Sequence, residues 1–318
     1  MTEQPVRYRS EDDDSARWEG FPFRRGDIVI STRSKSGTTW MQMICALLVF
    51  QTPELPAPLA TLSPWLDWLI TPRDEVFARL EEQKHRRFIK THTPLDGIPL
   101  NPMATYIVVG RHPLDLAVSL YHQGSNIDRD RVRQLVGHSG EAPAGGARLP
   151  RPPLREWLLS WIESDGKAAE QLDSLPGVLW HLSDAWARQA DPGLNGPTVL
   201  LVHYADLAAD LGGQMRMLAD VLGITVPEEK WPGLVHAASF EQMRAHAHQQ
   251  APDPAGVLKD PVAFFRRGKS GEGTQLLTAR ELAGYQARAA QLAPPAVLAW
   301  LHRDLARHPG RKEHAVAG

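Results

Sequence analysis

The feature that most constrains this chain is an apolar run that enters a short polar turn and is followed directly by a second apolar run. Residues 28–30 (Ile-Val-Ile) have the composition of a β-strand, and residues 41–50 that of a helix. The turn between them is rich in serine and threonine and carries Lys35 and Gly37. The N–H groups of such a turn and of the helix start converge on one spot, where the helix dipole favours negative charge. The segment therefore predicts a phosphate-binding loop.

The order of residues in this turn differs from that of ATP- and GTP-binding loops. Those P-loops place Gly-Lys-Ser/Thr after an earlier glycine. Here Lys35 precedes Gly37, and position 32 is a threonine. Hydroxyl donors come from Ser36, Thr38 and Thr39. We interpret the turn as a relative of the P-loop with a different arrangement of charge.

Three further apolar runs end in polar residues. Residues 88–89 lead into Lys90-Thr91-His92, residues 106–109 into Gly110-Arg111-His112, and residues 199–202 into His203-Tyr204. Continuous Val, Ile and Leu runs are typical of strands buried on both faces of a parallel sheet, whose ligands bind beyond the carboxyl ends of the strands. We therefore predict a single α/β domain with a central, mostly parallel sheet flanked by helices. Its strand ends would gather Lys35, Lys90, His92, Arg111 and Tyr204 on one rim.

These segments resemble four motifs of one enzyme family. Residues 32–40 resemble the 5′-phosphosulfate loop of the cytosolic-type sulfotransferases, and residues 90–92 resemble that family's motif with the catalytic histidine. Residues 106–122 resemble its 3′-phosphate motif, and residues 265–271 (Phe-Arg-Arg-Gly-Lys-Ser-Gly) resemble the segment that closes over the cofactor. The four motifs occur in the family's order. On this resemblance the chain is identified as a bacterial member of the family that uses 3′-phosphoadenosine 5′-phosphosulfate (PAPS).

The resemblance implies transfer of a sulfuryl group from PAPS to a hydroxyl, or less readily an amine, of a small-molecule acceptor by in-line displacement. His92 would be the general base that takes the proton of the acceptor hydroxyl. Lys35 would bind the bridging and leaving oxygens, and Lys90 would contact the transferring group. No metal is expected in this reaction, and the histidines outside the motifs lack metal-ligand spacing.

The resemblance also implies a set of residues that bind the donor. They are Lys35, Ser36, Gly37, Thr38, Thr39, Trp40, Arg111, Ser119, Tyr204, Phe240, Arg266, Arg267 and Gly268. Within this set the turn residues would hold the 5′-phosphate. Charge-assisted bonds to the 3′-phosphate would come from the arginines and from Ser119, eight residues after Arg111. Trp40 and Phe240 would stack on the adenine, and Tyr204 would meet the adenine edge or the ribose.

Several positions depart from the family pattern. Arg33 and Ser34 replace the tyrosine and proline that usually precede the loop lysine. Ala238 takes the place of a threonine near the adenine, and Glu272-Gly273 replaces an Asp-Trp pair. The dimerisation motif of the animal members is not recognisable, so the sequence leaves the oligomeric state open.

Two other functions stay open at the level of sequence. A small-molecule kinase could use the same loop for ATP, although the Gly-Lys-Ser/Thr order is missing and Asp206 is the one weak candidate for a Mg²⁺ ligand. A nucleotide-binding module without catalysis is the other alternative, against which the presence of both Lys35 and His92 argues.

The acceptor is open as well. Phenols, sterol-like alcohols, lipids and antibiotic-type metabolites all fit a pocket that could be lined by Trp65, Trp68, Trp157, Trp161 and Trp180.

Composition limits the partners and the compartment. Charged residues make up 23% of the 318 residues and the formal net charge is −2, which gives no reason to expect nucleic acid and suits a local basic pocket for a small anion. The single cysteine, Cys45, is expected to be a buried core thiol in a reducing compartment. No secretory signal is visible and the longest apolar run, residues 41–50, is short of a membrane span, so we expect a cytoplasmic protein.

The chain is predicted to be organised as one sulfotransferase-like domain over residues 25–307, with a polar lead-in (residues 1–24) and a polar tail (residues 308–318). Glycine and proline predict a loop over residues 137–153 and an irregular segment over residues 252–273. Three helix boundaries can be predicted as well. They are a Leu114–Gln123 helix ended by Gly124, and helix starts at the capping boxes Ser239-x-x-Gln242 and Thr278-x-x-Glu281.

Overall fold

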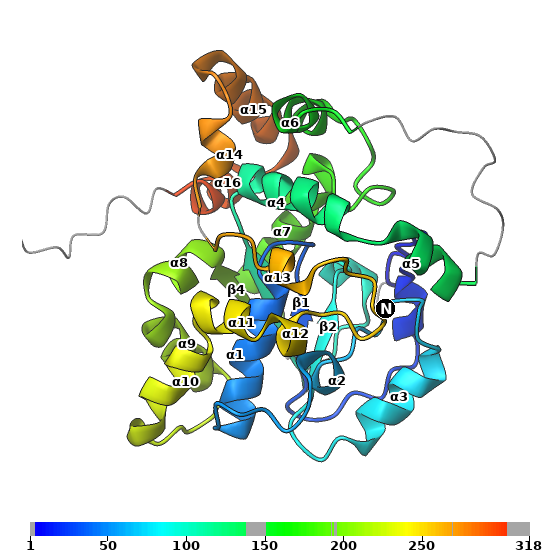
Figure 1. The fold of residues 1–318 in the computed structure, drawn as a ribbon, viewed down its shortest axis with the longest axis vertical. Helices are drawn as coiled ribbons and strands as arrows, with labels where there is room; N and C mark the ends of the chain where they lie inside the picture. Colours follow the sequence, from blue (N-terminus) through cyan, green and yellow to red (C-terminus); the bar gives the residue numbers. More distant parts are fainter. Residues whose placement is uncertain (1–3, 138–150, 192, 194–195, 269, 304–318) are drawn as a thin grey trace, which may run out of the picture.

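The computed structural model describes residues 4–137, 151–191, 193, 196–268 and 270–303 (Figure 1). Most of the predicted 137–153 loop, Lys269 of the C-terminal motif and the polar tail lie outside the described residues. Among the residues described, no helix is both long enough and apolar enough to span a membrane.

A four-stranded parallel sheet forms the centre of the fold (Figure 1). Its strands are β1 (Ile28–Ser31), β2 (Phe88–Thr91), β3 (Thr105–Gly110) and β4 (Thr198–His203). They are ordered β2-β1-β3-β4, and every neighbouring pair is parallel. The predicted α/β class with a mostly parallel sheet is therefore confirmed, and the four apolar runs found in the sequence are its four strands.

Helices cover both faces of the sheet. In the first half of the chain they are α1 (Thr38–Phe50), α2 (Leu59–Leu62), α3 (Arg73–Glu82), α4 (Pro113–Asn126), α5 (Arg129–Leu135), α6 (Leu154–Glu163) and α7 (Leu175–Ala190). The second half adds α8 (Tyr204–Ala209), α9 (Leu211–Val221), α10 (Trp231–Ala237), α11 (Phe240–Ala245), α12 (Ala247–Gln250), α13 (Pro261–Phe264), α14 (Glu272–Gln275), α15 (Ala279–Leu292) and α16 (Pro295–Leu301). Short 3₁₀ turns occur at η1 (Ser15–Trp18), η2 (Leu95–Gly97) and η3 (Glu228–Lys230).

The strands alternate between two hydrophobic cores, as the two-residue period of a strand requires. Ile28 and Ile30 belong to a core shared with α1, α9 and α10, which also buries Cys45 as predicted. Val29 of the same strand belongs to a core shared with α4, α6, α7 and α15. Burial on both faces explains why these strands read as continuous apolar runs in the sequence.

Local capping sets the starts of α11 and α15, whereas tertiary packing sets the end of α4. The Thr278–Glu281 capping box is present as predicted, and at Ser239 the hydroxyl accepts from the Gln242 amide at the start of α11. The predicted end of α4 at Gly124 is wrong, because the helix continues to Asn126. The guanidinium of Arg151 covers Gly124, about where a side chain would stand, so packing overrides the weak helix preference of glycine.

The N-terminal segment packs against the residues that follow α2. Trp18 is fully buried in the core, and the amide of Asp14 donates to the carbonyl of Asp67 at 2.9 Å. The amide of Leu69 in turn donates to the carbonyl of Asp12 at 2.8 Å. This pairing brings Asp12 to the carboxyl-end rim of the sheet.

Candidate active site

The turn between β1 and α1 depends on two residues with left-handed backbone angles. They are Lys35, with φ 65°, and Gly37, with φ 115°. A Cβ on Gly37 would lie 3.0 Å from the ring of Tyr204, so glycine is required both by the backbone and by the close approach of that ring. The hydroxyls of Thr32 and Thr38 hydrogen-bond to each other across the turn. The closed turn thus presents the first residues of α1 to the cavity beyond the sheet.

Lys35 lines this cavity. Its ammonium is 3.6 Å from the centroid of the Phe264 ring, 3.3 Å from Oε1 of Gln123 and 3.5 Å from the carbonyl of Phe264. Burial, followed by the repulsion of neighbouring cations, lowers the pKa of Lys35 from 10.5 to about 7. Those cations are Arg111, Lys90 and Arg266. An anion that enters the cavity relieves the repulsion among these cations. A site for a phosphosulfate group requires this behaviour.

Arg111 connects the 3′-phosphate motif to the turn. It follows β3, and its Nη1 donates to the carbonyl of Lys35 at 3.0 Å while its guanidinium stacks 4.4 Å above the Tyr204 ring. Ser119 faces the same cavity from α4, two helical turns further on. The structure therefore brings both residues of the predicted 3′-phosphate pair next to the turn.

Aromatic side chains surround the part of the cavity predicted to hold adenine. Trp40 donates from Nε1 to the carbonyl of Ala238 at 2.8 Å and meets Tyr204 edge-on, with ring centroids 5.2 Å apart. Phe240 packs against Gly268, whose φ is 64° and where a Cβ would come within 2.6 Å of the ring. Glycine at this position lets the C-terminal motif lie directly on Phe240.

The arginines of the C-terminal motif share a carboxylate partner. Like charges such as those of Arg266 and Arg267 repel each other unless an anion lies between them. The structure supplies a carboxylate, because Glu272 pairs with Arg266 at 2.5 Å and with Arg267 at 3.4 Å. The hydrogen bond from Arg266, together with the charges of Arg266 and Arg267, lowers the pKa of the Glu272 carboxyl, so it is charged at neutral pH.

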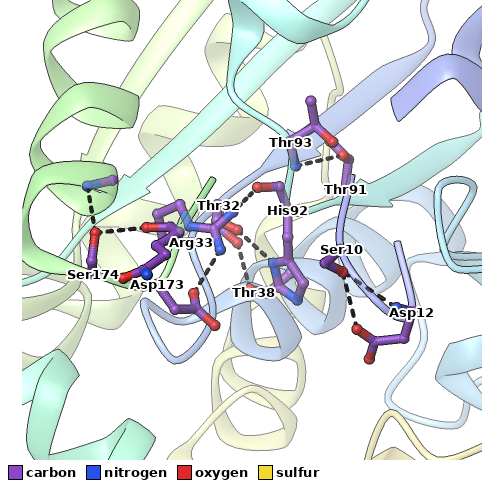
Figure 2. A network of polar contacts seen from close by, with 12 residues as sticks. Ser10, Asp12, Thr32, Arg33, Thr38, Thr91, His92, Thr93, Asp173 and Ser174 are labelled. Atoms are coloured by element: carbon purple, nitrogen blue, oxygen red, sulfur yellow. Dashed lines mark hydrogen bonds and ion pairs between the residues drawn. The ribbon is translucent and has the colours of Figure 1, made fainter. Parts of the chain in front are cut away.

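His92 is half-buried just beyond β2, and its ring has a defined tautomer (Figure 2). Nδ1 lies 2.6 Å from the carbonyl of Thr32. A carbonyl can only accept, so Nδ1 carries the proton and the lone pair is on Nε2. The edge of the ring meets Trp65, with centroids 4.8 Å apart. Burial and then the charges of Lys90 and Arg33 hold the pKa of His92 well below 6.5, which keeps the imidazole neutral and able to accept a proton.

Lys90 lies beside His92 at the end of β2. Its ammonium is 3.7 Å from the Trp65 ring centroid, and its side chain is almost fully buried. Burial lowers the pKa of Lys90 to about 8, against the opposing attraction of Asp13, Asp67 and Asp12.

The predicted site residues come together in one place. All of them except Ser36 line a single cavity of about 250 Å³. Ser36 is buried beneath the turn, and its amide donates to the carbonyl of Arg33, so it supports the turn from within. The cavity therefore brings the cationic turn together with His92 and Lys90.

Comparison with known proteins settles the family. The family described as sulfotransferase domain matches residues 25–291. The chain belongs to this family. It is 42% identical over 322 residues to a glycolipid sulfotransferase of Mycobacterium bovis, with 95% of each chain covered. Rat sulfotransferase 1A1 is 26% identical over 264 residues, or 79% of each chain.

Solved structures show the same fold. A mouse sulfotransferase, SULT7A1, complexed with PAP (adenosine 3′,5′-bisphosphate) superimposes with a TM-score of 0.65 at 20% identity, over 90% of each chain. Retinol dehydratase in complex with retinol and PAP gives 0.62 over 87% of this chain and 84% of that one. The prediction of a PAPS-dependent sulfotransferase with a P-loop-like turn is therefore confirmed for family, enzyme class and fold.

The part of the cavity around Trp65 and Trp68 is mainly apolar. Trp65 and Trp68 stack in parallel at 5.1 Å, and Trp68 packs with Val132 and Val257 in a small cluster that lines the cavity. Asp12 and Arg129 lie among these lining residues.

Three of the five tryptophans proposed for the acceptor pocket lie elsewhere. Trp157 and Trp161 line a separate groove beside α6, and Trp180 is 45% exposed, with Nε1 donating to the hydroxyl of Tyr8 at 3.0 Å. The three lie on α6 and α7, and the residue type alone does not show which face of a helix a tryptophan occupies.

Sequence reasoning missed Gln123 and Asp173, which both line the cavity. Gln123 is one helical turn beyond Ser119 on α4, so its spacing from Ser119 could have placed it on the same face of the helix. Asp173 lies between α6 and α7, in a stretch without any pattern, and no sequence signal pointed to it. Among the residues that the structure describes, no group of three or more His, Cys, Asp or Glu side chains could hold a metal ion.

Proposed function

We propose that this sulfotransferase transfers the sulfuryl group of PAPS to a hydroxyl of a glycolipid-like acceptor, with His92 as the general base. The observation that supports this most strongly is the single cavity, which brings together a cationic phosphate-binding turn and a neutral histidine. Nucleotide binding alone requires only the first of these. The second is what in-line attack on sulfur requires.

The residues at the donor end fit a phosphosulfate nucleotide. The turn and the N-terminus of α1 would receive the 5′-phosphate, and Arg111 and Ser119 the 3′-phosphate. Arg266, Arg267 and Gly268 would cover the 3′-phosphate, and Trp40, Tyr204 and Phe240 would enclose the adenine. The donor supplies an activated sulfuryl group. Lys35 would neutralise the charge that grows on the leaving oxygen.

At the acceptor end, Nε2 of His92 would take the proton of the acceptor hydroxyl while that oxygen forms a bond to sulfur. The bond from sulfur to the bridging oxygen breaks, and Lys35 stabilises the adenosine 3′,5′-bisphosphate that leaves. Lys90 would hold the sulfuryl oxygens through the transfer. The products are a sulfate ester and a protonated His92, which returns its proton to solvent.

A glycolipid-like acceptor is supported by two observations. The relatives at 42% identity are named glycolipid sulfotransferases, and they match over nearly the whole chain. The acceptor side also combines a stacked tryptophan pair, suited to a sugar face, with the apolar Val132 and Val257, suited to a hydrocarbon chain. A cytoplasmic location, and a single domain over residues 25–307, are parts of the same proposal.

Transfer from sulfur-labelled PAPS to alkyl glycosides of increasing chain length tests this function. We expect labelled product to increase with chain length, and glucose without an alkyl chain to be a poor acceptor. Equal transfer to glucose and to the alkyl glycosides would reject the apolar acceptor site. Sterol alcohols and 4-nitrophenol are included in the panel to represent the sterol-like and phenolic acceptors that the sequence leaves open.

The same assay with ATP in place of PAPS tests the kinase alternative. Asp206, its one candidate carboxylate, is paired with Arg303 and does not line the cavity, so we expect no phosphoryl transfer. Nucleotide binding without turnover on any acceptor of the panel would favour the non-catalytic alternative.

A further inference from the structure

Residues 32–33, after β1, and residues 91–92, at the end of β2, are joined by hydrogen bonds in both directions. The amide of Thr32 donates to the carbonyl of Thr91 at 3.2 Å, and Nδ1 of His92 donates to the carbonyl of Thr32 at 2.6 Å. Arg33 completes the set, because its Nη1 donates to the carbonyl of His92 (Figure 2). His92 is therefore held at both its ring and its backbone by residues 32–33.

The guanidinium of Arg33 has a second partner. Its Nη2 pairs at 2.6 Å with Oδ1 of Asp173, which arrives from the connection between α6 and α7. The Arg33 side chain is only 5% exposed, whereas that of Asp173 is 47% exposed and lines the cavity. One planar fork thus ties together three segments: the turn after β1, the end of β2 and the connection that leads into α7.

We propose that Arg33, anchored by Asp173, is a positioning residue that holds His92 in its reactive tautomer and orientation. The inference rests on the proposed function, in which His92 is the base. A guanidinium suits the task since its fixed fork can bond a carbonyl and a carboxylate at once, which a lysine cannot reproduce. The buried charge is compensated by Asp173, as a buried charge must be.

The electrostatic contribution of Arg33 acts in the same direction. The charged or titratable groups that act on the His92 ring are Lys90 from β2, Arg33 from the turn and His181 from α7. Both cations disfavour the imidazolium and so lower the pKa of His92, after the larger effect of burial. Loss of the Arg33 charge removes one of these effects, and the pKa of His92 should then rise. A side chain that serves only packing would leave this pKa unchanged.

Histidine-ring NMR tests the proposal without any need for turnover. In ¹⁵N-histidine-labelled protein, with the His92 signals assigned from His92→Ala, we expect the Nδ1–H tautomer and a pKa well below 6.5. Arg33→Ala should raise that pKa and mix the tautomers. Arg33→Lys should restore the charge but not the fork, so the pKa should return while the tautomer stays mixed. Unchanged His92 signals in both variants would overturn the proposal.

Kinetics with the best alkyl glycoside from the acceptor panel provide a second readout. Arg33→Ala should lower kcat by up to about 100-fold, the scale of an ångström-sized misplacement, while the Kd for adenosine 3′,5′-bisphosphate changes little. Asp173→Asn leaves Arg33 in place and should lower kcat less than Arg33→Ala does. If Arg33→Ala fails to fold, the kcat of Asp173→Asn still tests the proposal. A rise in acceptor KM alone in Asp173→Asn would instead place Asp173 on the acceptor and reject its role as anchor.

The chain offers a matched control pair. Arg216 and Glu228 form an exposed two-pronged ion pair at 2.6 and 2.8 Å, away from the cavity. Arg216→Ala and Glu228→Gln should change neither the His92 signals nor kcat. If His92→Ala itself kept full activity, the proposed function would fail, whereas the NMR result would still decide whether Arg33 positions the ring.

Discussion

Lys35, Lys90 and His92 share one cavity, and burial lowers the pKa of all three. For His92 the consequence is immediate, because a neutral imidazole is the form that accepts a proton. For the lysines the consequence depends on the ligand. An anion between them favours their charged forms, so the donor itself would complete the cationic site that stabilises the leaving group.

Replacing His92 by alanine should remove most turnover and leave product-nucleotide binding nearly intact. The base acts on the acceptor, on the far side of sulfur from the nucleotide, and a positioned base contributes roughly 10²–10⁴-fold. Single-turnover rates and calorimetric binding of adenosine 3′,5′-bisphosphate measure the two effects. A variant with near wild-type kcat would take His92 out of the mechanism.

Nucleotide binding should take up a proton from the buffer above neutral pH, and Lys35 should be the group that receives it. Its pKa in the free protein is about 7, so at pH 8 most of it is neutral, and the bound anion must raise that pKa. Affinity for adenosine 3′,5′-bisphosphate should therefore fall as pH rises above 7. Well below pH 7 Lys35 is already charged, and its contribution to the uptake should vanish.

Calorimetry at pH 8 in two buffers of different ionisation enthalpy measures this uptake. Lys35→Ala should lose it, and it should also lower kcat more than it weakens product-nucleotide binding, because the Lys35 contact strengthens as the leaving oxygen gains charge. Lys35→Arg is the matched control, since arginine stays charged and has no proton to gain. Equal proton uptake in Lys35→Ala and wild type would assign the titration to another group.

At the scale of elements, the strand ends organise the site. The turn after β1, the segment after β3 and the start of α8 meet through Lys35, Arg111 and Tyr204. Arg111 bonds the turn directly, so it contributes both to the shape of the turn and to the anion site. These two roles can be separated by comparing nucleotides with and without the 3′-phosphate.

Arg111→Ala should therefore erase the preference for a 3′-phosphorylated nucleotide. Loss of a charge-assisted bond costs roughly 1.5–3 kcal/mol, so binding of adenosine 3′,5′-bisphosphate should fall towards that of AMP. Any additional loss shared by both nucleotides reports the role of Arg111 in shaping the turn. Ser119→Ala should reduce the same preference by less, and equal losses for the two nucleotides in Arg111→Ala would place that side chain away from the 3′-phosphate.

Much of this arrangement could be predicted from the sequence because it depends on local pattern. Apolar runs buried on both faces identified β1 to β4, and polar residues directly after them identified Lys35, His92 and Arg111. The end of α4 was mispredicted because Arg151, distant in sequence, covers Gly124. Asp173 was missed for the same reason, since its role depends on a tertiary contact with Arg33.

At the scale of the whole molecule, the segment of residues 252–273 crosses the donor end of the cavity between two firm attachments. Asp260 is paired with Asn126 at the end of α4 through two hydrogen bonds, of 2.8 and 2.9 Å. Beyond the C-terminal motif, the amides of Gly271 and Gly273 donate to the buried carboxylate of Asp115 at 2.7 and 2.9 Å. The residues between these attachments include Arg266, Arg267 and Gly268.

This geometry favours a nucleotide-dependent lid over residues 261–268. In the free protein Arg266 is held by Glu272, a charge that the 3′-phosphate could replace. We therefore expect hydrogen exchange of residues 261–268 to slow when adenosine 3′,5′-bisphosphate is added, and to slow much less with AMP. Arg266→Ala should lose most of the added protection. The amides of Gly271 and Gly273 provide an internal control, because Asp115 should protect them with or without nucleotide. Exchange of residues 261–268 that is unchanged by the nucleotide would show a fixed surface segment instead of a lid.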